Sequence, residues 1–149
     1  MKILLAVDDS RFSEAATQAV IRQIKPEQAE VCVLHVVEPL LLIPEFRLGN
    51  LEALKASEKQ LRRHGEDVVA QAEQLLRGAG FKVRTKVREG DHRAEIIDQA
   101  AEWGADLIVL GSHGRKGLNR FLLGSVAEFV ARHADCSVEI VRISNHQKD

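Results

Sequence analysis

The chain has 149 residues, of which 45% are hydrophobic and 29% charged, and its formal net charge is −1. This balance excludes a general electrostatic attraction to nucleic acid or to an anionic membrane, and the absence of Tyr disfavours a base-stacking surface. No apolar run is long enough to span a membrane, and the two cysteines lack CxxC spacing, which indicates free thiols in a reducing compartment. We therefore expect a single cytoplasmic domain over residues 1–143, followed by a polar tail, 144–149.

The first 37 residues predict a strand, a helix and a second strand. Residues 3–7 and 31–37 are continuous apolar runs, as in central parallel strands that are covered on both faces. Ser10 is a good N-cap for a helix that ends before Pro26. This order is one βαβ unit, whose crossover is almost always right-handed.

The middle of the chain predicts an irregular segment and then a long helix. Residues 39–50 include the apolar run 40–43 between Pro39 and Pro44, a candidate lid or protein contact. A helix is expected from about 51 to 77, and Gly65 lies on its apolar stripe. That stripe recurs every seven residues, at Leu54, Leu61, Val68 and Leu75, with Ala72 and Leu76 beside it.

Residues 81–88 alternate between apolar and cationic side chains, as in an edge strand with one buried face. We interpret the cationic face as solvated and protective, since the protein is not basic overall; a polyanion-binding patch is the alternative. The face predicted to be buried consists of Phe81, Val83, Thr85 and Val87. The next helix should begin after Asp91 and turn Ile97, Ala100 and Ala101 inward.

The last part of the chain predicts a strand at 107–110, a glycine-rich loop, a helix from Ser125 to His133 and a short strand at 138–142. Glu139 within that last strand argues for an edge position. The whole pattern predicts an α/β fold: an open five-stranded parallel sheet with helices on both faces and strand order 3-2-1-4-5, as in flavodoxin-like proteins. Ligands of such folds bind where the strand order reverses, which places Asp8 and the Gly111–Ser125 loop in one crevice.

The loop between Gly111 and Ser125 is a candidate phosphate site, because glycine-rich backbone followed by a helix N-terminus presents N–H groups to anions. Two standard phosphate motifs are absent from the sequence. No GxxxxGK[ST] is present, and no GxGxxG follows the first strand, which ends in Ala6, Val7 and Asp8. A Walker NTPase and a typical dinucleotide enzyme are both disfavoured.

The spacing G-x-x-G-x9-G-S, from Gly111 and Gly114 to Gly124 and Ser125, closely resembles the ATP-binding signature of the universal stress protein family. KILLAVDDS, LHVVEP and the block from about 104 to 142 are also similar to that family, although Ser137 stands where the family often has Pro. The resemblance implies an adenine nucleotide (ATP, AMP or ADP), Mg²⁺ or Mn²⁺ carried on its phosphates, and a homodimer through strand 137–142. The charge balance predicts neither nucleic acid nor a membrane as partner.

The resemblance and the expected crevice together give the candidate binding residues. Glycines would let the backbone approach the ribose and phosphates, Asp8 would lie near the ribose and any phosphate-bound metal, and the backbone of Val36 would read the adenine edge. The alternative for Asp8 is that it only caps the first helix together with Ser10. The full set is Ala6, Val7, Asp8, Val36, Gly111, Ser112, His113, Gly114, Arg115, Gly124, Ser125 and Val126.

The remaining expectations concern the histidines and two further cations of the loop. His113 lacks a nucleophile partner, so we interpret it as an exposed loop residue rather than a general base. His35 reads as a satisfied core histidine, and the scattered histidines do not predict a dedicated metal site. Lys116 and Arg120 are further loop cations that could neutralise phosphates.

The sequence thus favours a nucleotide-binding regulatory protein with little turnover, because we find neither a general base nor a Walker lysine. A slow ATPase or nucleotidyl-transfer enzyme and a nucleotide-free interaction module remain alternatives. An FMN flavodoxin fits the fold, but it would need a Ser/Thr-rich loop after the first strand and more aromatic side chains.

Overall fold

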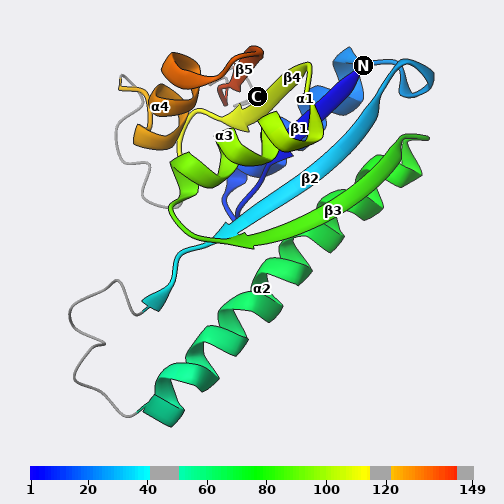
Figure 1. The fold of residues 1–149 in the computed structure, drawn as a ribbon. Coiled ribbons are helices and arrows are strands. Elements are labelled where there is room, and N and C mark those ends of the chain that lie inside the picture. The colour runs from blue at the N-terminus through cyan, green and yellow to red at the C-terminus, as the bar shows by residue number, and fades with distance from the viewer. Residues whose placement is uncertain (41–50, 115–121, 144–149) are drawn as a thin grey trace.

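The structure is a computed structural model that describes residues 1–40, 51–114 and 122–143. Its described strands form a single parallel sheet in the order β3-β2-β1-β4-β5, with helices on both faces (Figure 1). This confirms the predicted fold and strand order, with β3 and β5 at the edges. The elements are β1 (Lys2–Ala6), α1 (Arg11–Gln23), the 3₁₀ turn η1 (Pro26–Gln28), β2 (Glu30–Val37), α2 (Leu51–Gly78), β3 (Lys82–Glu89), α3 (His92–Trp103), β4 (Leu107–Gly111), α4 (Ser125–His133) and β5 (Ser137–Val141).

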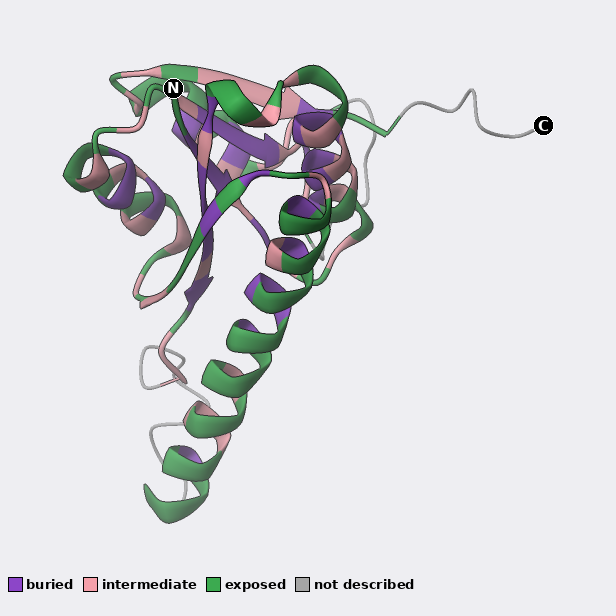
Figure 2. Cartoon of the chain, turned by 90° about the vertical axis from the view of Figure 1, so that its right-hand side faces the viewer, coloured by how far each residue is buried: buried purple, intermediate pink, exposed green. Residues whose placement is uncertain are grey.

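The sheet separates two hydrophobic cores. Alternate side chains of β1 point to opposite faces, so Ile3 and Leu5 join the core under α1 and α2, while Leu4 joins the core under α3 and α4. Burial on both faces explains why the central strands are continuously apolar (Figure 2). β1 is in register with both neighbours, pairing Leu4 with Cys32 of β2 and with Ile108 of β4.

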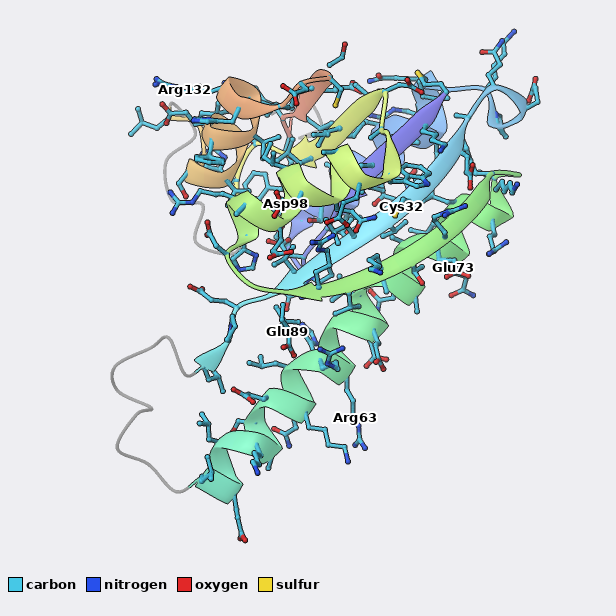
Figure 3. The ribbon with its side chains drawn as sticks, in the orientation of Figure 1. Cys32, Arg63, Glu73, Glu89, Asp98 and Arg132 are labelled. Carbon is cyan, nitrogen blue, oxygen red and sulfur yellow. The ribbon has the colours of Figure 1, made fainter. Side chains whose placement is uncertain are left out.

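Helix α2 packs its second half on the sheet and continues beyond the ends of the strands, so its first turns project from the molecule (Figure 1). Charged side chains such as Arg63 and Glu73 cover its outer surface (Figure 3). The prediction that Leu75 faces the core is wrong, because this side chain is 45% exposed, whereas Ala72 and Leu76 are buried. A seven-residue stripe drifts around an α-helix of 3.6 residues per turn, and by the fourth repeat it has left the core.

The edge strand β3 and the neighbouring helix α3 differ from the prediction in detail. Thr85 is exposed, at little cost for a small polar side chain on an edge strand, and Ala101 is exposed while Ile96 is buried. The cationic face is not simply solvated. Arg88 is only 18% exposed and forms ion pairs with Glu95 at 2.6 Å and Glu102 at 2.8 Å. These pairs attach α3 to the edge of the sheet.

Candidate functional site

A cleft of about 720 Å³ lies at the carboxyl ends of the central strands, where the order of the sheet reverses. Loops and termini of β1, β2 and β4 contribute to its lining, together with the first residues of α4 and with Leu61 and His64 of α2. Most of the predicted site residues line this cleft: Ala6, Val7, Asp8, Val36, Gly111, His113, Gly114, Gly124, Ser125 and Val126. The crevice predicted from strand order is therefore where the structure has its cleft.

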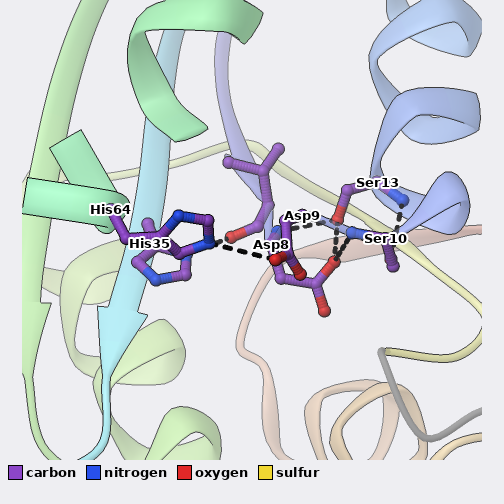
Figure 4. A network of polar contacts seen from close by, with 7 residues as sticks. Asp8, Asp9, Ser10, Ser13, His35 and His64 are labelled. Atoms are coloured by element: carbon purple, nitrogen blue, oxygen red, sulfur yellow. Dashed lines mark hydrogen bonds and ion pairs between the residues drawn. The ribbon is translucent and has the colours of Figure 1, made fainter. Parts of the chain in front are cut away.

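Asp8 is held by the start of α1 through one of its two carboxylate oxygens. Its Oδ1 accepts hydrogen bonds from the backbone N–H of Ser10 at 2.9 Å and from the hydroxyl of Ser13 at 2.8 Å (Figure 4). The backbone N–H of Asp8 donates to the same Ser13 hydroxyl at 2.8 Å. The other oxygen, Oδ2, faces Gly114, since a Cβ added to that glycine would lie 3.1 Å from it. Asp8 thus organises the helix start and also presents an oxygen towards the glycine loop.

Ser10 is the N-cap of α1, as predicted, and accepts a hydrogen bond from the N–H of Ser13 at 3.3 Å. The alternative, in which Asp8 only caps the helix, explains the hydrogen bonds to Oδ1 but not the position of Oδ2 at Gly114. Ser13 was not predicted as a site residue. Its signal in the sequence was weak, because a serine in the first turn of a helix is common.

Val36 presents its main chain to the cleft because β2 is longer than β1. The N–H of Val7 donates to the carbonyl of Leu34 at 2.8 Å, and this bond ends the pairing of the two strands. Along a strand, backbone groups alternate between the two neighbouring sides, so the groups of Val36 point to the same side as the Leu34 carbonyl, past the end of β1. The carbonyl of Val37 instead accepts from Gly90, towards β3. Val36 therefore offers a donor and an acceptor side by side at the cleft.

Two of the loop glycines make room for the protein itself and not for a ligand. A Cβ at Gly111 would lie 2.6 Å from the Phe12 Cβ and 2.9 Å from the Phe12 backbone, and a Cβ at Gly124 would lie 2.7 Å from the Ser112 carbonyl. The absent side chains at Gly111 and Gly124 are therefore needed for packing within the protein, and the approach of their backbone to ribose and phosphates stays a prediction. Only at Gly114 does the missing side chain open space beside Asp8, and none of the three has a positive φ.

His113 connects the end of β4 to Leu122, just before α4, through a hydrogen bond. The prediction that it is exposed is wrong, because its side chain is half-buried. Its Nε2–H donates to the carbonyl of Leu122, which can only accept, and its Nδ1 lies 3.1 Å from the hydroxyl of Ser112, from which it accepts when the ring is neutral. Its ring also contacts Phe12, with centroids 5.2 Å apart. Ser112 itself is buried and does not line the cleft; its N–H donates to Val141 of β5 at 2.9 Å. With both ring nitrogens engaged, His113 is not available as a general base.

The N-terminus of α4 opens onto the cleft. Ser125 and Val126 are the first two residues of α4, so their N–H groups have no hydrogen-bond partner within the helix. Both residues line the cleft. Gly124 is the N-cap and supplies no side-chain hydrogen bond. These N–H groups, at the positive end of the helix, form an anion-binding arrangement.

Three histidines that were not predicted as site residues line the other end of the cleft: His35, His64 and His92. The ring of His35 donates from Nδ1 to the carbonyl of Val7 at 2.8 Å, and burial, the largest effect, lowers its pKa below the usual 6.5. His35 is thus satisfied, as predicted, but it is a cleft residue as well. His64 donates from Nε2 to Asp9 at 3.0 Å. No pattern in the sequence predicts these contacts, since they join residues far apart in the chain.

Several predicted features fall outside the described residues: Arg115, Lys116 and Arg120 in the loop, most of the 39–50 segment, and the 144–149 tail. Among the residues that are described, no group of three or more His, Cys, Asp or Glu side chains is arranged to hold a metal ion, and no helix could cross a membrane.

Both cysteines are free thiols, and burial raises the pKa of Cys32 to about 11. A thiol so rarely ionised is unreactive.

Comparison with known proteins gives consistent results over the whole length. The model of the universal stress protein family matches residues 1–142. The universal stress protein MJ0531 of Methanocaldococcus jannaschii is 34% identical over 143 residues, which are 95% of this chain and 81% of that protein. The universal stress protein YxiE of Bacillus subtilis is 30% identical over 151 residues, covering 95% and 98%. The solved structure of UspA from Lactobacillus plantarum is 27% identical, covers 95% and 97%, and has a TM-score of 0.81.

Proposed function

Because the chain belongs to the universal stress protein family, we propose that it is a cytoplasmic regulatory protein whose cleft binds an adenine nucleotide, with ATP as the first candidate. The observation that carries the proposal is the meeting of three complementary groups in one cleft. These are the Oδ2 side of Asp8, the N-terminus of α4 and the main chain of Val36. They suit a ribose, a phosphate and an adenine edge respectively.

The phosphates are proposed to lie at the start of α4. The N–H groups of Ser125 and Val126 and the Ser125 hydroxyl would donate to phosphate oxygens, and the helix dipole favours the negative charge. Because Gly114 has no side chain, nothing from this residue covers Asp8 Oδ2, and a ribose beside Gly114 could contact that oxygen. Arg115, from the loop, is proposed to neutralise part of the phosphate charge.

The adenine is proposed to bind in the plane of the β2 main chain. The N–H of Val36 can donate to a ring nitrogen of adenine while its carbonyl accepts from the exocyclic amino group. Guanine presents the opposite pattern, an acceptor oxygen beside a ring N–H, and would place like groups together. Apolar side chains, Ile96 and Leu110 among them, line the cleft and suit a flat base.

A divalent cation fits this site only as a companion of the nucleotide. Mg²⁺ prefers phosphate oxygens, water and one or two carboxylates, and Asp8 can supply a single carboxylate oxygen. We propose that Mg²⁺ or Mn²⁺ is held through the phosphates with Asp8 nearby. Such an ion would neutralise part of the phosphate charge, and Asp8 is the residue that could contribute a carboxylate oxygen to it.

Other members of this fold are consistent with the choice of ligand class. One solved universal stress protein is in complex with cAMP. The protein from Arabidopsis thaliana has AMP bound, and the protein from Archaeoglobus fulgidus is in complex with dAMP. These proteins are at most 23% identical to this chain, so the likeness is one of fold. They support an adenine nucleotide as the class and leave ATP as the finer proposal.

The protein is further proposed to act as a homodimer through β5. This strand is an edge of the sheet, and its outer backbone groups can pair with a two-fold copy. A nucleotide that binds one assembly or conformation more tightly than another shifts the equilibrium by that difference, and regulation needs nothing more. Val138→Pro removes a donor from the edge, and sedimentation should then show monomers; an unchanged dimer would place the interface elsewhere.

The nucleotide site is tested by releasing any bound ligand from purified protein by denaturation and identifying it by chromatography. Titration calorimetry of the nucleotide-free protein with ATP, AMP and GTP then measures affinity. We expect adenine nucleotides to bind and GTP to bind at least tenfold more weakly, which corresponds to about 1.4 kcal/mol. Absence of binding by ATP and AMP would contradict the proposal. Steady phosphate release faster than roughly 1 per second would instead support an ordinary enzyme.

A further inference from the structure

Asp8 lies between two residues that are each held by a histidine. On its N-terminal side, the carbonyl of Val7 accepts from Nδ1–H of His35 at 2.8 Å. On its C-terminal side, the Asp9 carboxylate accepts from Nε2–H of His64 at 3.0 Å. Figure 4 shows the two rings on the same side of the 7–9 segment, opposite Ser10 and Ser13. The position of Asp8 therefore depends on groups outside its own strand and helix.

The His35 bond replaces a lost strand contact. β1 ends at Ala6, and a carbonyl just past the end of a strand must find another donor if it is shielded from water. Burial lowers the pKa of His35, so the ring is neutral at pH 7 and carries one N–H. The carbonyl of Val7 requires that hydrogen on Nδ1. His35 thus fixes the peptide group that immediately precedes Asp8.

Both histidines depend on α2. His64 belongs to this helix, and the next residue, Gly65, is buried directly against the ring of His35. A Cβ added at Gly65 would lie 2.7 Å from Cδ2 of His35 and 3.4 Å from a methyl group of Val37, so only glycine lets the helix come this close. The same helix projects beyond the sheet in its first turns (Figure 1).

We propose that His35 and His64 are positioning residues that connect α2 to the nucleotide site, by holding the residues on either side of Asp8 in the geometry that the ligand requires. A shift of α2 against the sheet would then change nucleotide affinity, and by linkage a bound nucleotide would favour one position of α2. The helix that projects from the domain would in this way sense whether the cleft is filled. This inference rests on the proposed function, because it assigns a regulatory element to the same site.

The test measures ATP and AMP affinity by calorimetry in two sets of variants. Gly65→Ala presses a methyl group onto the His35 ring and should weaken binding roughly tenfold. Gly78→Ala is its matched control, a glycine of the same helix whose added Cβ would meet nothing within 4 Å, and it should bind like the wild type. In a His35→Ala background the ring is gone, so Gly65→Ala should have little additional effect.

The second set separates positioning from packing. His35→Leu fills the space but cannot donate to Val7, and we expect about tenfold weaker binding. His35→Asn keeps an N–H close to the position of Nδ1 and should restore most of the affinity. His64→Ala changes an exposed side chain, so we expect it to fold; it should weaken binding about threefold and provides the test if the core variants fail to fold.

The outcomes distinguish the two proposals. If the wild type binds neither ATP nor AMP, the proposed function fails and this inference fails with it. If the wild type binds and the folded Gly65→Ala, His35→Leu and His64→Ala proteins bind equally well, only the positioning role is overturned. An Asn variant as weak as the Leu variant, with both folded by circular dichroism, would also overturn it, because the hydrogen bond to Val7 would then have no part.

Discussion

The two sides of the cleft are built in opposite ways. On the β1 side, side chains fix Asp8: Ser10 and Ser13 hold its Oδ1, and His35 and His64 hold the residues next to it. On the β4 side, it is missing side chains that matter, because the backbone at Gly111 and Gly124 runs against other backbone. The first side tolerates a change of one hydrogen bond by local adjustment. At Gly111 and Gly124 the second side has no room for an added Cβ, since backbone cannot rotate away as a side chain can.

The largest effect expected from this difference is on stability at the β4 side. Gly111→Ala and Gly124→Ala place a Cβ within 3 Å of backbone atoms, so α1 or the loop must move, and we expect a loss of about 1–3 kcal/mol in the free energy of unfolding. Urea unfolding of the two variants measures it. Gly78→Ala in α2 is the matched control and should be neutral or up to about 1 kcal/mol more stable. Unchanged stability of both loop variants would show that the loop relaxes more freely than its close contacts indicate.

The next effect separates binding from folding within the same loop. A valine at Gly114 would place its methyl groups at Asp8 Oδ2, where a Cβ is already 3.1 Å away, and Gly114 needs no positive φ. We expect Gly114→Val to abolish ATP binding in calorimetry while the circular dichroism spectrum and the unfolding midpoint stay close to those of the wild type. Gly114→Ala should fall between the two. Unchanged affinity in the valine variant would remove the loop from the proposed site.

A smaller effect is expected on the β1 side, where one atom of Asp8 can be changed alone. Asp8→Asn keeps an oxygen that can accept from Ser10 and Ser13, so the fold should be retained, but the charge at the proposed ribose and metal position is lost. We expect about tenfold weaker ATP binding and a reduced dependence on Mg²⁺. Asp106→Asn is the matched control, since Asp106 accepts from the Lys2 N–H at 2.7 Å at the opposite end of the sheet. Equal loss in both variants would indicate a general charge effect.

The sequence predicted the position of Asp8 on the β1 side, but on the β4 side it predicted the glycine loop without the contacts of its glycines. Continuous and alternating apolar runs identified the central strands and the edges, and the strand order then brought Asp8 to the glycine loop, because parallel topology leaves few arrangements. The spacing of the glycines marked the loop but did not reveal what each missing Cβ would meet. Gly111 touches Phe12 only because α1 crosses the end of β4, which is a tertiary fact.

The contacts of His35 and His64 could not be predicted from the sequence. Gly65 looked like a packing glycine on the stripe of α2, and His35 looked like a core residue, but nothing in either pattern joins them across 30 positions. The contact depends on the rotation of α2 about its axis. That rotation is also what moved Leu75 out of the core, because a strict seven-residue count does not follow an α-helix. Periodicity predicts which residues share a face over two or three turns, and the error grows along a helix as long as this one.

The smallest expected effect tests the β1 side through pH. Burial lowers the pKa of His35 from its usual 6.5; the hydrogen bond to Val7 and the charge of Asp8 oppose this shift, and neighbouring His92 and His64 act in the same direction as burial. The unfolded chain therefore takes up a proton near pH 6.5 before the folded protein does, so this contribution to stability is fully present above pH 6.5 and is lost as the pH falls below it. Wild type should lose more stability than His35→Asn between pH 7.5 and pH 5.5, measured as the shift of the urea midpoint. The Asn variant keeps the donor to Val7 but cannot take up a proton, so an equal loss in both proteins would assign the acid sensitivity to groups other than the one that holds the end of β1.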